Sequence, residues 1–383
     1  MRIAIFSDTF APEINGVALT LKRFTEYLEK QDIEYRLFVP TANTPVPSVP
    51  QVERLTSIPF LLYRDCRFTI PNPSHIKQVL DEFKPTLIHI ATPFNLGLFG
   101  LHYGKKYDIP MIASYHTHFD DYLDYYYLSF LKKWIWKYME WFHRPFEKVY
   151  VPSISTKEKL LAKELHPDID IWGRGVDHNF YTPIKQSKDF FKERYNILDK
   201  KIILYVGRIS PEKNIDTALE TYEALPNNVK KESHLVIVGD GPLYRTLSEQ
   251  HQEHITWTGF IQGEELARIY ASSDIFLFPS PTETFGNVVL EALASGLPVI
   301  GANAGGVQNL VVDGQTGFLC EPMNSKAFAL ATTRLLENQS LRDTLSTKAR
   351  TFAKTLSWDE IFSKLVNSYD EVLRRRKGIS NIA

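Results

Sequence analysis

SPTETFGNVVLEALASGLPVI, residues 280–300, overlaps the end of the apolar run IFLFPS (275–280) and finishes in a second apolar run. This order predicts a buried strand, a turn, a helix that begins near Gly286, and another buried strand. The helix is almost entirely apolar, as expected for an element that packs on a sheet. Two carboxylates interrupt the segment, Glu283 in the expected loop and Glu291 in the second turn of the helix.

The same alternation extends over the whole chain of 383 residues. Short β-branched runs separated by helix-length segments predict parallel strands with helices on both faces. The alternation of strand-like and helix-like segments stops at GRGVDHNFYTP and begins again at KIILYVGRI (201–209). We therefore predict an α/β protein with two Rossmann-like domains. In such sheets the ligand binds beyond the carboxyl ends of the strands. Other predicted strands are RIAIFS (2–7), YRLFVP (35–40), LIHIAT (87–92), IPMIASYH (109–116), KVYVPS (148–153), HLVIVGDG (234–241), ITWTGF (255–260) and LPVIGAN (297–303).

The composition excludes several classes of protein. Hydrophobic residues make up 44% and charged residues 23%, which is typical of a globular protein. A net charge of -1 argues against a nucleic-acid partner held by phosphate neutralisation. Cys66 and Cys320 lie far apart, which fits a reducing cytoplasm without a disulfide framework. We expect neither a signal peptide nor a membrane span, and therefore a cytoplasmic location.

Each glutamate of the opening segment has two interpretations. The amino terminus of a helix attracts phosphate, because its free N–H groups carry partial positive charge. A carboxylate nearby can accept hydrogen bonds from two vicinal ribose hydroxyls, and Gly286 permits close approach of the backbone. The alternative is that Glu283 caps the helix and that Glu291 is only partly exposed.

A second candidate loop, VGRISPEKN (206–214), follows the first predicted strand of the second domain. It carries Arg208 and Lys213 between a strand and a helix. Arginine offers a planar fork of donors and lysine a point charge, which together suit a pyrophosphate. Two solvated surface cations are the alternative.

The first domain offers Gly16 and His116. Gly16 stands at a helix start just after the first strand, where its N–H can face a phosphate or sugar oxygen, although a simple turn is the alternative. His116 lies at the carboxyl end of a buried strand, where ligand-binding residues belong. His118 is less well placed, and a purely structural histidine remains an alternative for both.

Taken together, NGV, HTHF, GRISPEKN, VGDGP, TETFGNVVLEALASGLPVI and NAGG with DGQTGFL resemble the family 4 retaining glycosyltransferases of GT-B fold, over essentially the whole chain. SYHTHFDDYLDYY and WGRGVDHNFY more narrowly resemble the mannosyl-, glucosyl- and sulfoquinovosyltransferases that modify lipids such as diacylglycerol. The resemblance implies two Rossmann-like domains, 1–178 and 179–358, that face each other across a cleft. It also implies a helix at about 359–383 that packs back on the first domain.

The resemblance implies roles for the candidate residues of the second domain. Arg208 and Lys213 hold the donor pyrophosphate and stabilise charge on the departing nucleotide. Glu291 accepts the ribose hydroxyls. The base lies near WTGF, which includes Gly259 and Phe260, and is bound largely through the backbone.

Further implied roles concern the donor sugar. Glu283 lies beside the sugar, and Phe285 and Gly286 offer backbone contacts. From the first domain, Gly16 approaches the phosphates and His116 contacts the sugar near the reaction centre. Most relatives have two adjacent glycines in the first loop, whereas this chain has Asn-Gly.

The expected reaction is a metal-independent transfer in which the nucleotide sugar is a substrate and no cofactor is needed. Arg208 and Lys213 can do the work of a cation on the leaving group. The Asp-Ile-Asp sequence at 168–170 does not follow a predicted strand, and we interpret it as a solvated turn rather than a metal site. A front-face retaining route is favoured over a double displacement, because no carboxylate pair of the glycosidase type stands out.

We expect the enzyme to transfer a hexose from GDP-mannose or a UDP-hexose to a membrane lipid such as diacylglycerol or a glycolipid. A soluble or polysaccharide acceptor is one alternative. A non-catalytic nucleotide-sugar-binding protein and a nucleotide-sugar epimerase of the same fold are others.

The expected lipid contact is the aromatic, basic segment YYYLSFLKKWIWKYMEWFHRPFEK (125–148). An amphipathic helix of this kind can lie on an anionic membrane, here on the cytoplasmic face of the cell membrane. A core helix with a solvated basic face is the alternative. The predicted apolar stripe is Leu128, Leu131, Ile135, Tyr138 and Phe142, and the polar side is Lys133, Lys137, Glu140 and Arg144.

Overall fold

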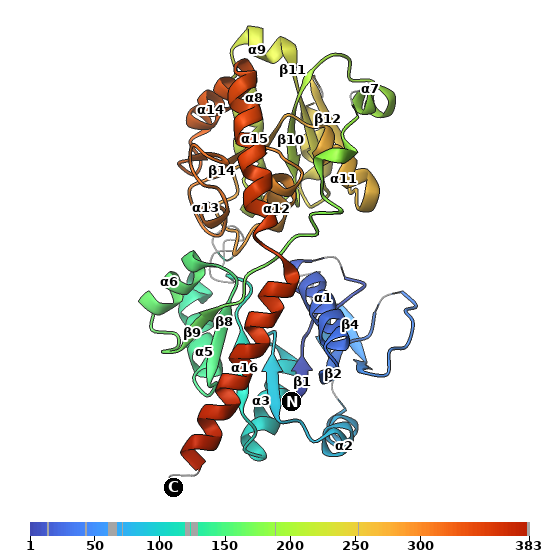
Figure 1. Ribbon diagram of the computed structural model, residues 1–383, viewed down its shortest axis with the longest axis vertical. Helices are drawn as coiled ribbons and strands as arrows, with labels where there is room; N and C mark the ends of the chain where they lie inside the picture. The colour runs from blue at the N-terminus through green and yellow to red at the C-terminus, as the bar shows by residue number, and fades with distance from the viewer. Residues whose placement is uncertain are drawn as a thin grey trace. The chain divides into compact units, whose positions relative to one another are not determined.

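The computed structural model describes residues 1–13, 15–42, 44–59, 67–70, 72–118, 123, 129–187, 189–251 and 253–380. This part of the chain forms two compact units (Figure 1). The first unit contains the described residues within 1–120, 128–173 and 358–383, and the second contains those within 121–127 and 174–357. Each unit is built on a parallel sheet, which confirms the predicted pair of Rossmann-like α/β domains.

Seven described strands form the sheet of the first unit, and all of them are parallel. In spatial order they are β3 (Val52–Leu55), β2 (Glu34–Pro40), β1 (Arg2–Phe6), β6 (Leu87–Ile90), β7 (Met111–Ser114), β8 (Lys148–Val151) and β9 (Ile169–Ile171). Every residue of β6, β7 and β8 is buried, which explains their continuous apolar character. A separate antiparallel pair consists of β4 (Ser57–Pro59) and β5 (Arg67–Thr69).

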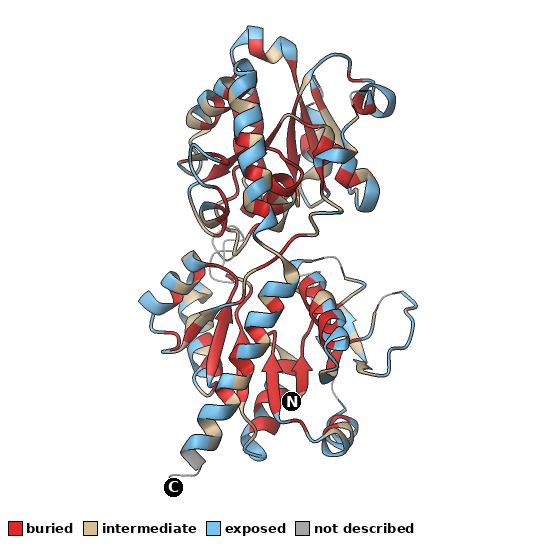
Figure 2. Ribbon diagram, in the orientation of Figure 1, coloured by how far each residue is buried: buried red, intermediate tan, exposed pale blue. Residues whose placement is uncertain are grey.

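Helices cover both faces of this sheet. One face packs against α2 (Pro73–Phe83), α3 (Asn95–Lys106), α5 (Lys132–His143) and α6 (Ile154–Ala162). The other packs against α1 (Gly16–Lys30) and α16 (Trp358–Ser380), which lies along the first unit (Figure 1). Figure 2 shows the consequence, buried strands surrounded by helices whose outer sides are exposed.

Six described strands form the parallel sheet of the second unit. Their spatial order is β12 (Ile255–Gly259), β11 (Ser233–Val238), β10 (Lys201–Val206), β13 (Ile275–Phe278), β14 (Val299–Ala302) and β15 (Gly317–Cys320). The order reverses at β10, which pairs with β11 on one side and β13 on the other. The helices are α7 (Phe190–Tyr195), α8 (Ile215–Glu223), α9 (Asn227–Glu232), α10 (Tyr244–Gln250), α11 (Gly263–Ser272), α12 (Asn287–Ala294), α13 (Val307–Leu310), α14 (Ser325–Glu337) and α15 (Gln339–Lys354).

Tyr369 attaches α16 to the centre of the first sheet. Its hydroxyl lies 2.9 Å from Nδ1 of His89, and Nε2 of His89 lies 2.7 Å from Oγ of Ser114. Complete burial lowers the pKa of His89 to about 3, so the neutral ring can accept the tyrosine proton at Nδ1 and donate at Nε2. Phe24 and Trp172 pack around the same ring and complete an aromatic cluster under α16.

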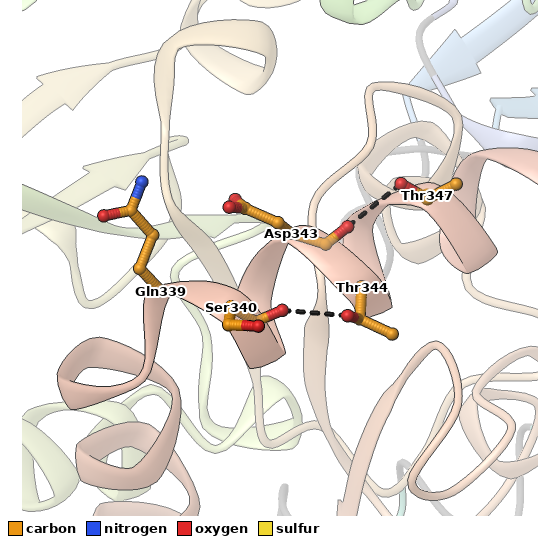
Figure 3. Close-up of a pocket in the computed structure, with 5 residues that line it drawn as sticks. All are labelled: Gln339, Ser340, Asp343, Thr344 and Thr347. Atoms are coloured by element: carbon orange, nitrogen blue, oxygen red, sulfur yellow. Dashed lines mark hydrogen bonds between the residues drawn. The ribbon is translucent and has the colours of Figure 1, made fainter.

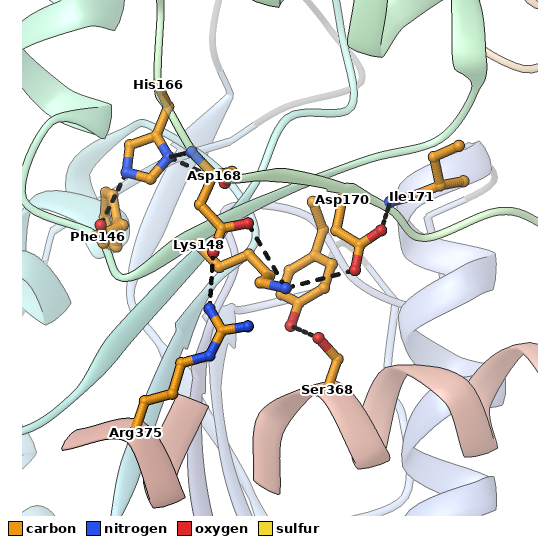
Figure 4. A network of polar contacts seen from close by, with 9 residues as sticks. Phe146, Lys148, His166, Asp168, Asp170, Ile171, Ser368 and Arg375 are labelled. Atoms are coloured by element: carbon orange, nitrogen blue, oxygen red, sulfur yellow. Dashed lines mark hydrogen bonds and ion pairs between the residues drawn. The ribbon is translucent and has the colours of Figure 1, made fainter. Parts of the chain in front are cut away.

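The interpretation of residues 168–170 as a solvated turn is wrong, because β9 begins at Ile169. Asp168 and Asp170 flank the buried ammonium group of Lys148 at 3.6 and 3.5 Å. Arg375 of α16 donates to Asp168 at 3.3 Å, so the network joins β8, β9 and α16 (Figure 4). The two carboxylates neutralise a buried lysine and hold the last helix.

Three further features bear on the expectations from sequence. No helix within the described ranges has the length and apolar character that crossing a membrane requires. Within the same ranges, no group of three or more His, Cys, Asp or Glu side chains is placed to hold a metal ion. Cys320 is a buried free thiol, and Cys66 lies outside the described residues.

Replacing Phe362 by Ala should lower the free energy of unfolding by about 3–5 kcal/mol, because its ring is fully buried between α1 and α16. Tyr369→Phe keeps the ring but removes the donor to His89, and should cost about 1–3 kcal/mol. Denaturant unfolding measures both, with the exposed Lys364→Ala on the same helix as the control. If Phe362→Ala is as stable as this control, α16 does not stabilise the first unit.

Candidate active site

Two loops of the second unit leave neighbouring strands at the point where the strand order reverses. Residues 207–214 follow β10, and residues 279–286 follow β13, which is paired with β10. Both loops start at carboxyl ends of parallel strands, the position where open α/β sheets bind ligands. Arg208 and Lys213 lie in the first loop and Glu283 in the second.

Lys213 and Glu283 are in direct contact although 70 residues separate them. Nζ of Lys213 lies 2.5 Å from Oε1 of Glu283, and the two side chains are only 14% and 16% exposed. Oγ of Ser280 donates to the same carboxylate oxygen at 3.3 Å. The interpretation of Lys213 as a solvated surface cation therefore does not hold.

The backbone around Arg208 is fixed by the glycines of the VGDGP motif. A Cβ atom at Gly239 would lie 1.8 Å from the carbonyl oxygen of Gly207, and one at Gly241 would lie 2.3 Å from that of Ile209. Only glycine allows two backbone segments to approach so closely. The buried hydroxyl of Tyr205 also donates to the carbonyl of Arg208 at 3.3 Å.

The loop that carries Glu283 is supported by the glycines of the NAGG motif. The N–H of Gly306 donates to the carbonyl of Glu283 at 2.6 Å. A Cβ atom at Gly305 would lie 2.5 Å from the same carbonyl oxygen, and one at Gly306 would lie 2.4 Å from Cα of Phe285. These contacts fix the backbone of the loop just before α12.

Helix α12 begins at Asn287, next to the predicted position, after Gly286 with φ of 102°. Gly286 is the N-cap of this helix, and the Glu283 carboxylate bonds to Lys213 and Ser280 instead, so the alternative role of Glu283 as a helix cap is wrong. Glu291 is partly exposed and accepts a hydrogen bond from the hydroxyl of Tyr270 at 3.1 Å. Burial, aided by the nearby carboxylate, raises the pKa of Tyr270 far above its ordinary value, so the hydroxyl stays a donor.

Gly259 and Phe260 lie at the carboxyl end of β12, on the same edge of the sheet. The carbonyl of Gly259 accepts from the N–H of Gly239 at 2.9 Å, and Gly259 has a φ of 72°. Phe260 follows with a ring that is 55% exposed. An exposed aromatic side chain next to a glycine offers a flat surface for a planar ligand group.

Gly16 is the first residue of α1 and is exposed. Asn15 is the N-cap of this helix. Its Oδ1 accepts from the N–H groups of Val17 and Ala18 at 3.1 and 2.9 Å. The asparagine thus satisfies donors that a glycine would leave to solvent or ligand.

His116 lies two residues beyond β7 and is 9% exposed, with its ring edge-on to Trp172 at 5.4 Å. His118 is also buried, and its Nε2 lies 3.2 Å from Oγ1 of Thr156. Both histidines and Gly16 belong to the first unit, whereas the cation and carboxylate loops belong to the second.

The amphipathic segment has two different apolar stripes. Leu128 lies outside the described residues, but Phe142 is buried, and Ile135 and Tyr138 pack partly buried against the core of the first unit. The stripe predicted from sequence therefore faces the core. A second stripe, Phe130, Trp134 and Trp141, is 73%, 72% and 55% exposed, and Lys133, Lys137 and Arg144 are exposed beside it.

The residues that line a hollow on the surface of α15 do not combine cations with a carboxylate, as the two loops of the candidate site do (Figure 3). The hydroxyls of Thr344 and Thr347 donate to carbonyls of the preceding helical turn at 2.8 and 3.0 Å. These polar groups are therefore used within the helix itself. The lining residues are Gln339, Ser340, Asp343, Thr344 and Thr347.

Sequence analysis did not single out Tyr270 and Ser280, which hold Glu291 and Glu283. The sequence around these two residues does not indicate which residue each one contacts, because that contact depends on the order of the strands in the sheet. The supporting glycines had a signal, since VGDGP and NAGG each follow a predicted strand. Glycine at a strand end is typical of close backbone approach.

Two family models match most of the chain. The model described as Glycosyltransferase Family 4 matches residues 14–180. The model described as Glycosyl transferases group 1 matches residues 187–352, which contain both loops of the candidate site.

Three relatives match over nearly the whole chain. A GDP-mannose-dependent alpha-mannosyltransferase of Corynebacterium glutamicum is 31% identical, over 97% of this chain and 89% of its own. The sulfoquinovosyl transferase SQD2 of Arabidopsis thaliana is 30% identical, over 96% of this chain and 72% of its own. An alpha-monoglucosyldiacylglycerol synthase of Streptococcus pneumoniae is 30% identical, over 99% of this chain and 90% of its own.

The fold is shared with solved structures. Sucrose-phosphate synthase from Thermosynechococcus elongatus superposes with a TM-score of 0.81 at 22% identity, over 98% of this chain and 99% of that one. These matches confirm the resemblance drawn from the motifs. The chain belongs to the family 4, group 1 glycosyltransferases, retaining enzymes of GT-B fold that transfer a sugar from a nucleotide sugar.

Proposed function

We propose that this enzyme transfers a hexose from a nucleoside-diphosphate sugar, GDP-mannose or a UDP-hexose, to a membrane lipid. The observation that carries the donor part is the contact of Lys213 with Glu283 beside Arg208, at the reversal point of the second sheet. A site for a sugar diphosphate needs cations for the pyrophosphate and, next to them, a group that accepts hydrogen bonds from the sugar hydroxyls. This arrangement provides both.

In the proposed complex, Arg208 and Lys213 bind the pyrophosphate of the donor. The amino terminus of α12, which follows Gly286, adds partial positive charge. Glu291 accepts the ribose hydroxyls, and the hydrogen bond from Tyr270 holds its carboxylate in place. The base lies against residues 259–260, where the exposed ring of Phe260 can stack on it.

The carboxylate of Glu283 accepts hydrogen bonds from hydroxyls of the donor sugar, and backbone groups of Phe285 and Gly286 also contact the sugar. The fixed backbone of this loop makes such contacts precise without a cost in ordering. Gly16 and His116 are assigned to the phosphates and the sugar from the first unit, as the family resemblance implies. Asn15 makes the amino terminus of α1 a capped helix start at this position.

The proposed chemistry follows from the distribution of charge. Breaking the bond between the anomeric carbon and the phosphate oxygen leaves negative charge on the pyrophosphate and positive charge on the sugar. Arg208 and Lys213 can stabilise the first of these once they contact the pyrophosphate, so we propose that the transfer needs no metal ion. The acceptor hydroxyl attacks from the face that the nucleotide leaves, which retains the configuration of the anomeric carbon.

A lipid acceptor is supported by two independent observations. The Streptococcus pneumoniae relative is named for a diacylglycerol product. In this chain, Phe130, Trp134 and Trp141 form an exposed aromatic stripe on and before α5, next to exposed lysines. Aromatic and basic side chains on one helix favour peripheral binding to an anionic membrane on its cytoplasmic face.

Lys213→Ala and Arg208→Ala should each lower transfer about 10²–10³-fold, because each removes a positive charge that stabilises the leaving group. The assay incubates the enzyme with GDP-mannose or a UDP-hexose and diacylglycerol vesicles, and mass spectrometry measures the glycolipid formed. Arg245→Ala, on the exposed surface of α10, is the matched control. Turnover close to that of the control in both variants would reject the pyrophosphate site.

Glu291→Gln should weaken binding of the preferred nucleoside diphosphate about tenfold or more, since the ribose loses hydrogen bonds to a charged acceptor. Calorimetry with UDP and GDP measures this effect and also identifies the base. Glu249→Gln on the exposed side of α10 is the control. Unchanged affinity in Glu291→Gln would remove this residue from the nucleotide site.

The double variant Trp134→Ser, Trp141→Ser should lose most of its binding to anionic vesicles, because these rings supply the apolar area next to the lysines. Flotation with phosphatidylglycerol vesicles measures binding, and high salt should weaken it in the wild type. Leu330→Ser, an equally exposed apolar residue on α14, is the matched control. A wild-type protein that does not float with the vesicles contradicts the membrane part of the proposal.

A further inference from the structure

The lysine assigned to the pyrophosphate forms an ion pair with a carboxylate. Nζ of Lys213 lies 2.5 Å from Oε1 of Glu283, and both side chains are more than four-fifths buried. Ion pairs withdrawn from water are screened less than surface pairs. A phosphate that binds Lys213 must therefore compete with Glu283.

We infer that Glu283 occupies the place of a phosphate oxygen on Lys213 and competes with the diphosphate product for this lysine. The inference rests on the proposed function and deepens it. When the nucleotide sugar binds, Lys213 moves to the pyrophosphate and Glu283 to the sugar hydroxyls. Once the sugar has left, Glu283 has lost its hydroxyl partners and returns to Lys213, which weakens the binding of the remaining diphosphate.

The exchange requires rotation of side chains only. The carbonyl of Glu283 is held by Gly306 at 2.6 Å, and Oγ1 of Thr282 donates to the carbonyl of Glu212 at 2.9 Å. The first bond fixes the backbone of the Glu283 loop against the NAGG segment, and the second joins the side chain of Thr282 to the backbone of the loop that carries Lys213. Lysine and glutamate side chains contain several rotatable bonds, so each can change partners while the loops stay in place.

Charge makes the competition selective for the product. The outer phosphate of a free nucleoside diphosphate has a second ionisation near about pH 6, as phosphomonoesters do. Above that pH, the free diphosphate carries about one more negative charge than the nucleotide sugar, in which the sugar esterifies this oxygen. The Glu283 carboxylate beside Lys213 therefore repels the product more strongly than the donor. A nucleoside monophosphate has no outer phosphate at this position and should be much less affected.

Glu283→Gln tests the inference, because it removes the charge and keeps the shape of the side chain. Calorimetry at pH 7.5 compares UDP with UMP and GDP with GMP in the wild type, Glu283→Gln and Glu291→Gln. We expect Glu283→Gln to bind the preferred diphosphate about tenfold more tightly, the order of one like charge removed from a partly screened site. Its affinity for the monophosphate should change less than about threefold, whereas Glu291→Gln should bind both nucleotides more weakly.

Thermal melting checks that each variant is folded, and Glu283→Ala repeats the measurement if the glutamine variant is not. Equal or weaker diphosphate binding in the folded charge-free variant would overturn the inference, since Glu283 would then support Lys213 rather than compete for it. In that case, weaker binding in Glu291→Gln would leave the proposed nucleotide site intact. Failure of the wild type to bind either diphosphate would overturn the inference and the proposed function together.

Discussion

The salt bridge between Lys213 and Glu283 exists because the second sheet reverses its strand order at β10. Strands are added on one side of β10 through β11 and β12, and then on the other side through β13 and β14. The loops after β10 and β13 therefore meet at the carboxyl edge with no helix between them. Every role assigned to this unit depends on that meeting, since neither loop alone combines fixed cations with a carboxylate for sugar hydroxyls.

Glycines keep this arrangement rigid at small cost. Gly239 and Gly241 lie against the backbone of the cation loop, and Gly305 and Gly306 lie against that of the carboxylate loop. Any side chain at these four positions would push a loop away from the sheet edge. In the first unit a side chain has the corresponding role, because Oδ1 of Asn15 caps α1. In the proposed exchange, the backbones of both loops stay in place while the side chains of Lys213 and Glu283 change partners.

Much of the fold could be predicted from sequence because central parallel strands are buried on both faces and form continuous apolar runs. The edge strands β3, β9 and β15 were not predicted. All three are short and partly exposed, and β3 and β9 also include charged residues, such as Asp170 in β9. Motif spacing singled out Lys213 and Glu283, but their contact depends on strand order, which spacing alone does not contain. In α5 the helical period was clear, yet Trp134 and Trp141 lie outside the stripe that it predicted, because the sheet beneath the helix decides which side is buried. The ligands of the site residues, and the domain boundaries drawn from the resemblance, stay predictions.

Crystal structures of the enzyme with its nucleoside diphosphate, and with a non-reactive analogue of the nucleotide sugar, would test the central claim most directly. The account predicts that Nζ of Lys213 lies within about 3 Å of a phosphate oxygen in both complexes. In the analogue complex, Glu283 should have left Lys213 for the sugar hydroxyls. A nucleotide bound away from the loops after β10 and β13, or a Lys213–Glu283 pair that stays intact with no phosphate contact, would contradict the account.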